Sequence, residues 1–276
     1  MYIEQTLLTG IDINQSANVY RSNCLCYYHS NEGININQSW NCRVVDCVSW
    51  NSAGNRGFRA NNSPGVVFQG CNATGCGYGY ELRNSTNLRC VGCYANGCTI
   101  YGILYTNNGD GVISGCTIED CLTGIQISGA AEFSVTGCLL TGCLLGIFAD
   151  TSTTHGTVSG CTVRNYTGTF GIQLTGTGTI TGCSVDSGAG AGIRAIGDDI
   201  VISGCTSSNN SSYGIDCQTS NDCIIIGCRT FSNGLYGVRL TGGVTDCSII
   251  GCNMRGNTVG SLSDASTTPN LSANLT

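Results

Sequence analysis

Cysteine recurs with a nearly constant spacing along most of this 276-residue chain. Neighbouring members of the series are separated by 22 to 24 residues. A repeat of this length, kept over eleven positions, is typical of a solenoid, in which each repeat forms one turn and packs on the next. The series, here called the cysteine column, consists of Cys24, Cys47, Cys71, Cys93, Cys116, Cys138, Cys161, Cys183, Cys205, Cys228 and Cys252.

Each repeat shows apolar-polar alternation and lacks the 3.6-residue period of a helix. An apolar residue stands three positions before the column cysteine, from Val44 to Ile249, and a glycine directly precedes nine of the eleven cysteines. A second glycine opens an apolar-x-apolar step, as in Gly124-Ile125-Gln126-Ile127. Short alternating runs bounded by turn residues predict strands. A leucine-rich frame is absent, and a propeller blade needs roughly 40 to 50 residues.

The sequence therefore predicts an all-β, single-stranded parallel β-helix with about ten to eleven coils and three short strands per coil. We expect residues 1–17 to form a lead-in or incomplete first coil, residues 18–262 to form the solenoid, and residues 263–276 to form a polar tail. The cysteine column is expected to stack inside the coils.

The repeated patterns V-x-G-C-x-(I/V) and G-I-x-(I/L), between Asn18 and Leu262, resemble the pectate-lyase-like right-handed β-helix superfamily. This group includes polysaccharide lyases, polygalacturonases and bacteriophage tailspikes, and the chain looks most like the tailspike or fibre domains. The resemblance implies a right-handed coil and not a particular activity. Of the polygalacturonase motifs only Asp198-Asp199 and His155-Gly156 occur, in the wrong order, and the required lysine is missing from the chain.

Charge and hydropathy exclude several classes of function. The formal charge of −6 and the pI near 4.7 argue against nucleic-acid binding, which requires a basic surface. No window reaches the ~18 apolar residues of a membrane span, so we expect no membrane insertion. The N-terminus lacks a charged segment followed by an apolar segment, so we expect synthesis in the cytosol without a signal peptide. We expect the protein to act on a virion or outside the cell after its synthesis in the cytosol.

The 21 cysteines could serve metal binding, electron transfer, a disulfide framework or core packing. Zinc requires four ligands converging on one point, whereas a column spreads its thiols along an axis. Disulfide frameworks are typical of small secreted scaffolds. Cysteine also behaves as a small, polarisable core residue. We therefore expect buried, mostly reduced thiols and no bound metal.

A second column lies six residues before the cysteines and is mostly polar, with Asp110 and Glu132 on successive coils. Asn and Asp in turns bond neighbouring backbone amides, which explains most of this column. If the chain is an enzyme, a polysaccharide hydrolase or lyase, Asp110 and Glu132 are its candidate catalytic pair, because carboxyl groups ~5 Å apart suit a retaining glycosidase. Asp199, Asp222 and Asp246 would stack like charges, which attracts a cation such as Ca²⁺.

Arginines, carboxylates and exposed aromatics gather in the N-terminal half of the chain. Tyr and Trp beside Arg and carboxylate suit sugar rings, which need apolar contact together with hydrogen bonds. The same composition is enriched in subunit interfaces. The candidate substrate-binding residues are Trp50, Arg59, Tyr78, Glu81, Arg83 and Tyr101.

The sequence thus favours a β-helix of viral tailspike or fibre type that recognises a cell-surface polysaccharide, forms a homotrimer and cleaves its glycan if it is an enzyme. A non-enzymatic virion, fibre or filament protein is the first alternative. An ice-binding solenoid is the second, because Ser134-x-Thr136, Thr157-x-Ser159 and Thr179-x-Thr181 form a short Thr/Ser grid, although β-propensity also accounts for it.

Overall fold

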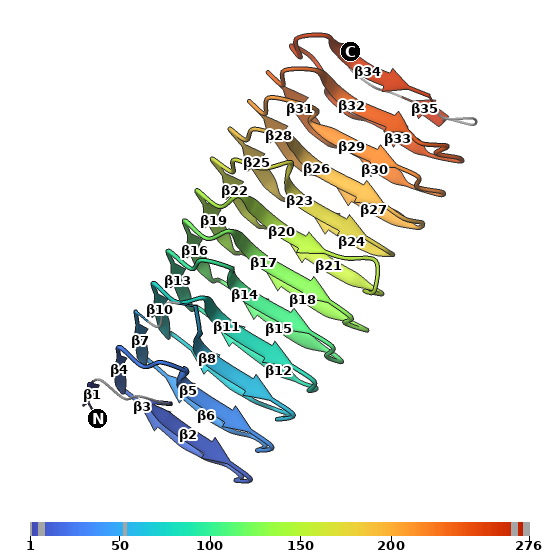
Figure 1. The fold of residues 1–276 in the computed structure, drawn as a ribbon. Coiled ribbons are helices and arrows are strands. Elements are labelled where there is room, and N and C mark those ends of the chain that lie inside the picture. Colours follow the sequence, from blue (N-terminus) through green and yellow to red (C-terminus); the bar gives the residue numbers. More distant parts are fainter. Residues whose placement is uncertain (1, 5–8, 52–53, 266–269, 273–276) are drawn as a thin grey trace. The chain divides into compact units, whose positions relative to one another are not determined.

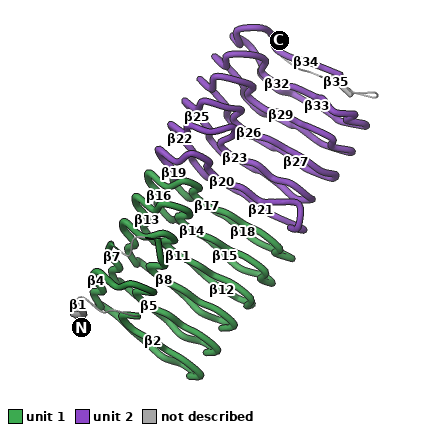
Figure 2. Tube along the Cα trace, viewed as in Figure 1, with its two compact units in different colours: residues 1–139 green, residues 140–276 purple. Residues whose placement is uncertain are grey.

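The computed structural model describes residues 2–4, 9–51, 54–265 and 270–272, and the side chains of residues 9–51 and 54–265. Within these ranges the secondary structure is strand and turn throughout, with no helix (Figure 1). The chain divides into unit 1, residues 1–139, and unit 2, residues 140–276 (Figure 2). Each unit is a parallel β-solenoid, so the predicted fold class is confirmed.

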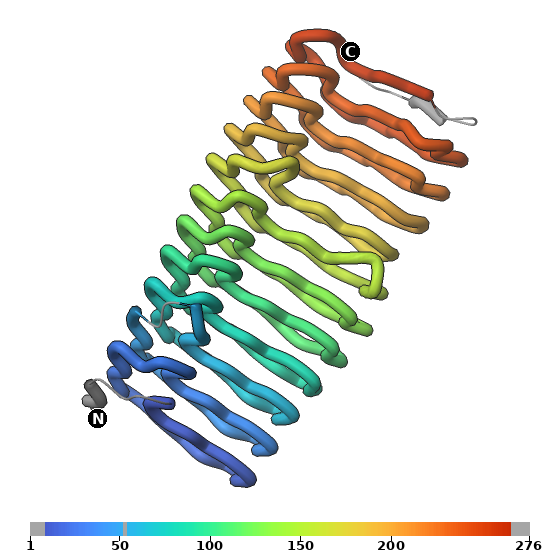
Figure 3. The backbone as a smooth tube through the Cα atoms, viewed as in Figure 1, coloured from blue at the N-terminus to red at the C-terminus, as the bar shows by residue number. Residues whose placement is uncertain are grey.

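Unit 1 contains three parallel sheets, and each turn contributes one strand to each sheet (Figure 3). Sheet 1 contains β1 (Tyr2–Glu4), β4 (Leu25–Tyr27), β7 (Val48–Trp50), β10 (Asn72–Thr74), β13 (Tyr94–Asn96) and β16 (Thr117–Glu119). Sheet 2 contains β2 (Ile11–Asn14), β5 (Glu32–Asn37), β8 (Arg56–Asn61), β11 (Tyr78–Arg83), β14 (Tyr101–Thr106) and β17 (Thr123–Ser128). Sheet 3 contains β3 (Tyr20–Ser22), β6 (Arg43–Val45), β9 (Val67–Gln69), β12 (Leu88–Val91), β15 (Gly111–Ser114) and β18 (Phe133–Thr136).

Unit 2 follows the same plan after β19 (Leu139–Thr141), which spans the boundary between the units. Its sheet 1 contains β22 (Thr162–Arg164), β25 (Ser184–Asp186), β28 (Thr206–Ser208) and β31 (Arg229–Phe231). Its sheet 2 contains β20 (Leu145–Ala149), β23 (Phe170–Thr175), β26 (Ala191–Ile196), β29 (Ile215–Gln218), β32 (Tyr236–Thr241) and β34 (Gly260–Asp264). Its sheet 3 contains β21 (Gly156–Ser159), β24 (Gly178–Thr181), β27 (Ile200–Ser203), β30 (Ile224–Ile226), β33 (Ser248–Ile250) and β35 (Asn270–Ser272).

The expected boundaries of the solenoid at residues 18 and 262 stay predictions. Strand β2 lies before residue 18 and pairs with β5, and β34 extends to Asp264. Most of the expected tail, 263–276, lies outside the described residues. The part of the chain that the structure describes contains no helix long and apolar enough to cross a membrane.

The interior of each turn is built by the residues that the repeat predicted. The apolar position three residues before the column cysteine is buried in every turn from Val44 to Ile249. All 21 cysteines are buried, as expected for core residues. The thiol of Cys71 donates to the carbonyl oxygen of Gln69 at 3.4 Å and lies equally close to that of Val44. Cysteine fits this turn because it is small and carries a weak donor.

Burial keeps the thiol of Cys26 protonated. It raises the pKa of Cys26 to about 12, and the neighbouring thiols of Cys24 and Cys47 add to the effect. The thiolate is the form that binds metals and attacks disulfides. A buried, protonated thiol such as that of Cys26 therefore acts as a packing group.

The residue before each column cysteine forms a bend with a left-handed backbone conformation. The preceding residue has a positive φ near 60° where it is glycine, as at Gly70 and Gly92. Asn23 and Asp46 replace glycine there with φ values of 52° and 51°. Asn and Asp tolerate this left-handed region better than other side chains, so one bend is kept by three residue types.

A second glycine column lies at the corner between sheets 1 and 2, and here the constraint is distance between backbones. A Cβ atom built on Gly79 would lie 2.5 Å from the carbonyl oxygen of Gly102 on the next turn. The same conflict recurs at Gly33, Gly57 and Gly102, at 2.6 to 2.8 Å from the next turn's carbonyl. Only glycine allows successive turns to approach so closely at this corner.

His29 is one of the two histidines of the chain. It follows β4 in a turn, but it is buried, and its Nε2 lies 2.8 Å from the Ser49 hydroxyl. Burial lowers the pKa of His29 below its usual value, so the imidazole is held in its neutral form. His29 is therefore a buried polar group of the unit 1 interior.

We predict that Gly79→Ala destabilises the protein whereas Gly92→Asn does not. The alanine Cβ would meet the Gly102 carbonyl, and overpacking of this kind costs about 1 to 3 kcal/mol. Gly92 has a φ of 58° with no atom near its Cβ position, and asparagine accepts that conformation. Thermal unfolding followed by circular dichroism measures both variants. Equal melting temperatures for the two would contradict the backbone contact.

Candidate functional site

The structure brings together five of the six predicted substrate-binding residues. Arg59 lies on β8, Tyr78, Glu81 and Arg83 lie on β11, and Tyr101 lies on β14, all in sheet 2 of unit 1. The sixth, Trp50, lies at the end of β7 in sheet 1. Whether any of the six binds a substrate stays a prediction, but their arrangement can now be described.

Strand register explains why these side chains meet. Arg59 lies opposite Glu81, and Tyr78 lies between Arg56 on one neighbouring strand and Tyr101 on the other. Successive residues of a strand point to opposite faces of the sheet. The buried positions Phe58, Tyr80 and Leu82 therefore alternate with outward positions, which gather on one outer face.

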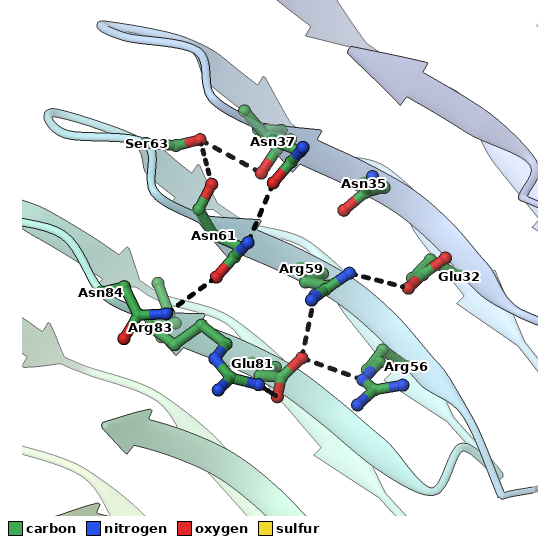
Figure 4. Close-up of polar contacts among 12 residues, drawn as sticks. Glu32, Asn35, Asn37, Arg56, Arg59, Asn61, Ser63, Glu81, Arg83 and Asn84 are labelled. Carbon is green, nitrogen blue, oxygen red and sulfur yellow. Dashed lines mark hydrogen bonds and ion pairs between the residues drawn. The ribbon is translucent and has the colours of Figure 1, made fainter. Parts of the chain in front are cut away.

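Glu81 is the centre of this face. Its Oε2 lies 2.9 Å from Nε of Arg56 and 3.1 Å from Nε of Arg59, while its Oε1 lies 3.3 Å from NH1 of Arg83 (Figure 4). The carboxylate is covered, since Glu81 is only 2% exposed, whereas the three arginine side chains are between 23% and 34% exposed. The cations therefore lie nearer to solvent than the anion that holds them.

A second carboxylate and a row of amides extend the network. Glu32 on β5 accepts from NH1 of Arg59 at 3.2 Å and from the Thr9 hydroxyl at 2.9 Å. Asn61 donates to Asn37 at 2.9 Å and accepts from Asn84 at 3.1 Å (Figure 4). These contacts link each turn to the next, and Asn37 and Asn61 meet because they are in register on neighbouring strands.

Two tyrosines lie at the edge of the arginine cluster. The rings of Tyr78 and Tyr101 are 5.4 Å apart, and the guanidinium carbon of Arg56 lies 5.1 Å from the Tyr78 ring centre. Partial burial, together with Tyr78, raises the pKa of Tyr101, so its hydroxyl stays protonated and available as a donor. We call the outer surface formed by Arg56, Arg59, Tyr78, Arg83 and Tyr101 the arginine–tyrosine face.

The arginine–tyrosine face is suited to hold an anionic, ring-containing ligand. The ion pairs with Glu81 use Nε of Arg56 and Arg59, and a guanidinium carries five N–H donors in total. The fixed guanidinium groups can therefore offer their other donors to a carboxylate or sulfate at little further entropic cost. The adjacent tyrosine rings provide apolar contact for a sugar ring.

Arg56 was not among the predicted substrate-binding residues, and the carboxylates that hold the arginines are buried. Arg56 is the first residue of β8, and apolar-polar alternation alone does not show whether such a residue belongs to the strand or to the preceding turn. Its place on the face follows from its register with Tyr78 on the next strand. In unit 2, Arg194, Asp216 and Arg239 alternate in charge on three successive strands in register, a pattern typical of ion pairs at the surface. Asp216 is instead fully buried, with Nε of Arg239 at 2.7 Å and Nε of Arg194 at 3.3 Å.

The predicted catalytic pair lies elsewhere in unit 1. Asp110 and Glu132 are exposed and stand just before β15 and β18, whose paired register places them on adjacent turns. The backbone carbonyl of Asp110 accepts from the amide of Asn87. That asparagine borders a shallow hollow of about 400 Å³ lined by Asn41, Pro64, Gly65, Val67, Asn87 and Arg89. A catalytic role for the pair stays a prediction.

The aspartates considered for Ca²⁺ occupy turns of unit 2. Asp199, Asp222 and Asp246 are exposed and have φ values of 52° to 54°. The amides of Asp199 and Asp222 donate to backbone carbonyls of the following turn, at Asn221 and Thr245. Among the residues described, no three His, Cys, Asp or Glu side chains converge in a way that could hold a metal ion. Their turn geometry accounts for these residues without a cation.

We predict that Glu81→Gln lowers stability more than Glu132→Gln. The first change removes the charge that three arginines share, and after allowance for solvent around the arginines the cost is about 1 to 2 kcal/mol. The second removes an exposed carboxylate and should cost less than about 0.5 kcal/mol. Urea unfolding measures both. Similar unfolding midpoints would show that the Glu81 contacts contribute nothing.

Comparison with known proteins places the fold in a family. The family model "Right handed beta helix region" matches residues 2–140 and 105–254. No curated protein matches the sequence. Among solved structures, the periplasmic alginate epimerase AlgG is similar with a TM-score of 0.71 and 14% identity, over 99% of this chain and 76% of its own.

Two bacteriophage tailspikes are similar as well. Tailspike protein 3 of bacteriophage CBA120 matches with a TM-score of 0.65 and 13% identity, over 99% of this chain and 56% of its own. The tailspike of E. coli bacteriophage HK620, solved as a D339N mutant with a pentasaccharide, matches with a TM-score of 0.57 and 12% identity, over 99% of this chain and 59% of its own. At these identities the likeness concerns the fold. With more than half of its length matched by the family model, this chain belongs to the right-handed β-helix family.

Proposed function

We propose that this protein binds an acidic surface polysaccharide through the arginine–tyrosine face of unit 1. The observation that carries the proposal is the sharing of one buried carboxylate, Glu81, by three partly exposed arginines beside a tyrosine pair. Such an arrangement fixes cationic donors at the surface before a ligand arrives, which lowers the entropic cost of binding. The structural neighbours include an alginate epimerase and a tailspike with bound pentasaccharide, which supports a polysaccharide as the ligand.

The biological setting that we propose is a viral tailspike or fibre. Two tailspikes share the fold, and the 21 buried cysteines suit a protein made in a reducing cytosol. Use on a virion and assembly into a homotrimer belong to this proposal. A trimer would show as three times the 28.6 kDa chain mass in light scattering at working concentration.

We predict that Arg56→Gln weakens binding of an acidic polysaccharide about tenfold, because one charge-assisted hydrogen bond is lost, and a factor of ten corresponds to roughly 1.4 kcal/mol. Glutamine keeps a donor for Glu81, so the fold should persist. The exposed Arg255 of unit 2 provides the matched control as Arg255→Gln. Calorimetric titration with alginate and with its carboxyl-reduced, neutral form measures the effect. Equal affinity for the two polymers and for all variants would overturn the proposal.

Cleavage of the glycan is a further part of the proposal and depends on Asp110 and Glu132. We predict that Asp110→Asn and Glu132→Gln each lower the release of reducing ends at least 100-fold, the range expected for loss of a general acid or base. The exposed Asp120, on a neighbouring turn, supplies the control Asp120→Asn. Unchanged release in both variants would eliminate the pair, and binding without any release by the wild type would eliminate cleavage.

A further inference from the structure

A cluster of exposed aromatic side chains lies on the outer face of sheet 1 in unit 1, whereas the arginine–tyrosine face belongs to sheet 2. Trp50 is 42% exposed and Tyr28 is 47% exposed. The Tyr27 ring meets Trp50 edge-on, at 5.6 Å and 87°, and the Tyr28 ring lies 5.8 Å from it at 54°. We call Tyr27, Tyr28 and Trp50 the aromatic platform. Its neighbours hold the indole in place without covering it.

Polar side chains continue from the aromatic platform along the same face. Trp50 lies in register with Thr74, which lies in register with Asn96, and Asn96 with Glu119. The row spans three strand spacings of ~4.8 Å, or about 14 Å. An aromatic ring therefore begins a row of hydroxyl, amide and carboxylate groups long enough for a short oligosaccharide.

The polar end of the row is already ordered. The Tyr94 hydroxyl donates to Oε2 of Glu119 at 2.5 Å, and the Asn96 amide donates to the same oxygen at 3.2 Å. The hydrogen bond to Glu119 raises the pKa of Tyr94, so the phenol remains a donor. Beside them the Thr74 hydroxyl donates to the Asn72 side chain at 2.8 Å. These groups offer both donors and acceptors to sugar hydroxyls.

Charge on this face separates its ligand from that of the arginine–tyrosine face. Strands β4, β7, β10, β13 and β16 read LCY, VSW, NAT, YAN and TIE, and none of them contains an arginine. Their one charged residue is Glu119, a carboxylate that would repel an acidic sugar. An uncharged sugar meets no such barrier, and its apolar ring face can pack on the indole.

We infer that the aromatic platform and the row from Thr74 to Glu119 form a second saccharide site, specific for uncharged sugars. Trp50 would stack on one sugar ring, and Asn96 and Glu119 would bond hydroxyls further along the chain. The site lies on a different sheet from the arginine–tyrosine face and does not depend on acidic-polysaccharide binding. A row with amide, hydroxyl and carboxylate groups favours a hydroxylated ligand over a second protein copy, which would leave these groups desolvated.

The two tryptophans of the chain allow a direct test. Trp40, 49% exposed, lies in the turn after β5, so Trp40→Phe leaves Trp50 as the only indole and Trp50→Phe leaves Trp40. We predict that at least one uncharged oligosaccharide among cellopentaose, mannopentaose and maltopentaose gives a saturable change in the tryptophan fluorescence of the Trp40→Phe variant. Trp50→Phe should give none, and Asn96→Ala, added to Trp40→Phe, should weaken binding about tenfold.

The outcomes separate this inference from the proposed function. Arg56→Gln should leave the affinity for the uncharged oligosaccharide unchanged while weakening binding of alginate. No response of Trp40→Phe to the oligosaccharides, with alginate binding intact, would overturn the second site alone. A change in tryptophan fluorescence with protein concentration in the absence of sugar, if Trp50→Phe abolishes it, would show that the aromatic platform mediates self-association. That outcome would also overturn the inference.

Discussion

Backbone contact between successive turns is the constraint on which the rest of each unit depends. At the corner between sheets 1 and 2 the approach is so close that a Cβ on Gly57, Gly79 or Gly102 would lie 2.5 to 2.8 Å from the next turn's carbonyl oxygen. Parallel hydrogen bonds then fix the register of every strand with the strand one turn away. On the outer face of a sheet, each side chain therefore lies beside the side chains about one repeat earlier and one repeat later in the sequence.

This register explains the turn-to-turn networks. On the outside of unit 1, Asn61 donates to Asn37, its register partner one turn earlier, and accepts from Asn84, which follows its register partner Arg83 on the next turn. Inside unit 2, Asn210 donates to Asn233, and Asn233 donates to Asn257. Glu81 is covered because its neighbours in register carry long side chains. Burial of a carboxylate is tolerated where arginines satisfy it, as they also do at Asp216.

Most of the fold was predictable from the sequence, because a solenoid repeats its constraints. The spacing of the cysteine column gave the period, the alternation gave the strands, and glycine, Asn and Asp gave the bend before each cysteine. The same alternation identified Arg59, Glu81 and Arg83 as outward residues of one sheet. What alternation reports is the side of the sheet on which a residue lies.

The features of the site that could not be predicted from the sequence are those on which apolar-polar alternation gives no information. It does not report how deeply a side chain is covered, and Glu81 and Asp216 lie buried beside arginine side chains. It did not identify Arg56, which opens its strand. Trp50 was grouped with the arginines because it is close to them in the sequence, although the corner between β7 and β8 places it on another sheet.

A flat sheet face can recognise a polymer without a deep pocket, and the two faces of unit 1 fit that mode of binding. A polysaccharide presents the same groups at regular intervals, and a solenoid presents columns of side chains at intervals of ~4.8 Å. Each contact is weak, but successive contacts along one ligand are intramolecular after the first, so affinity accumulates. Specificity then depends on the chemistry of each column. In the proposed functions, arginines fixed by Glu81 would select negative charge, and Trp50 followed by Asn96 and Glu119 would select an uncharged, hydroxylated ring.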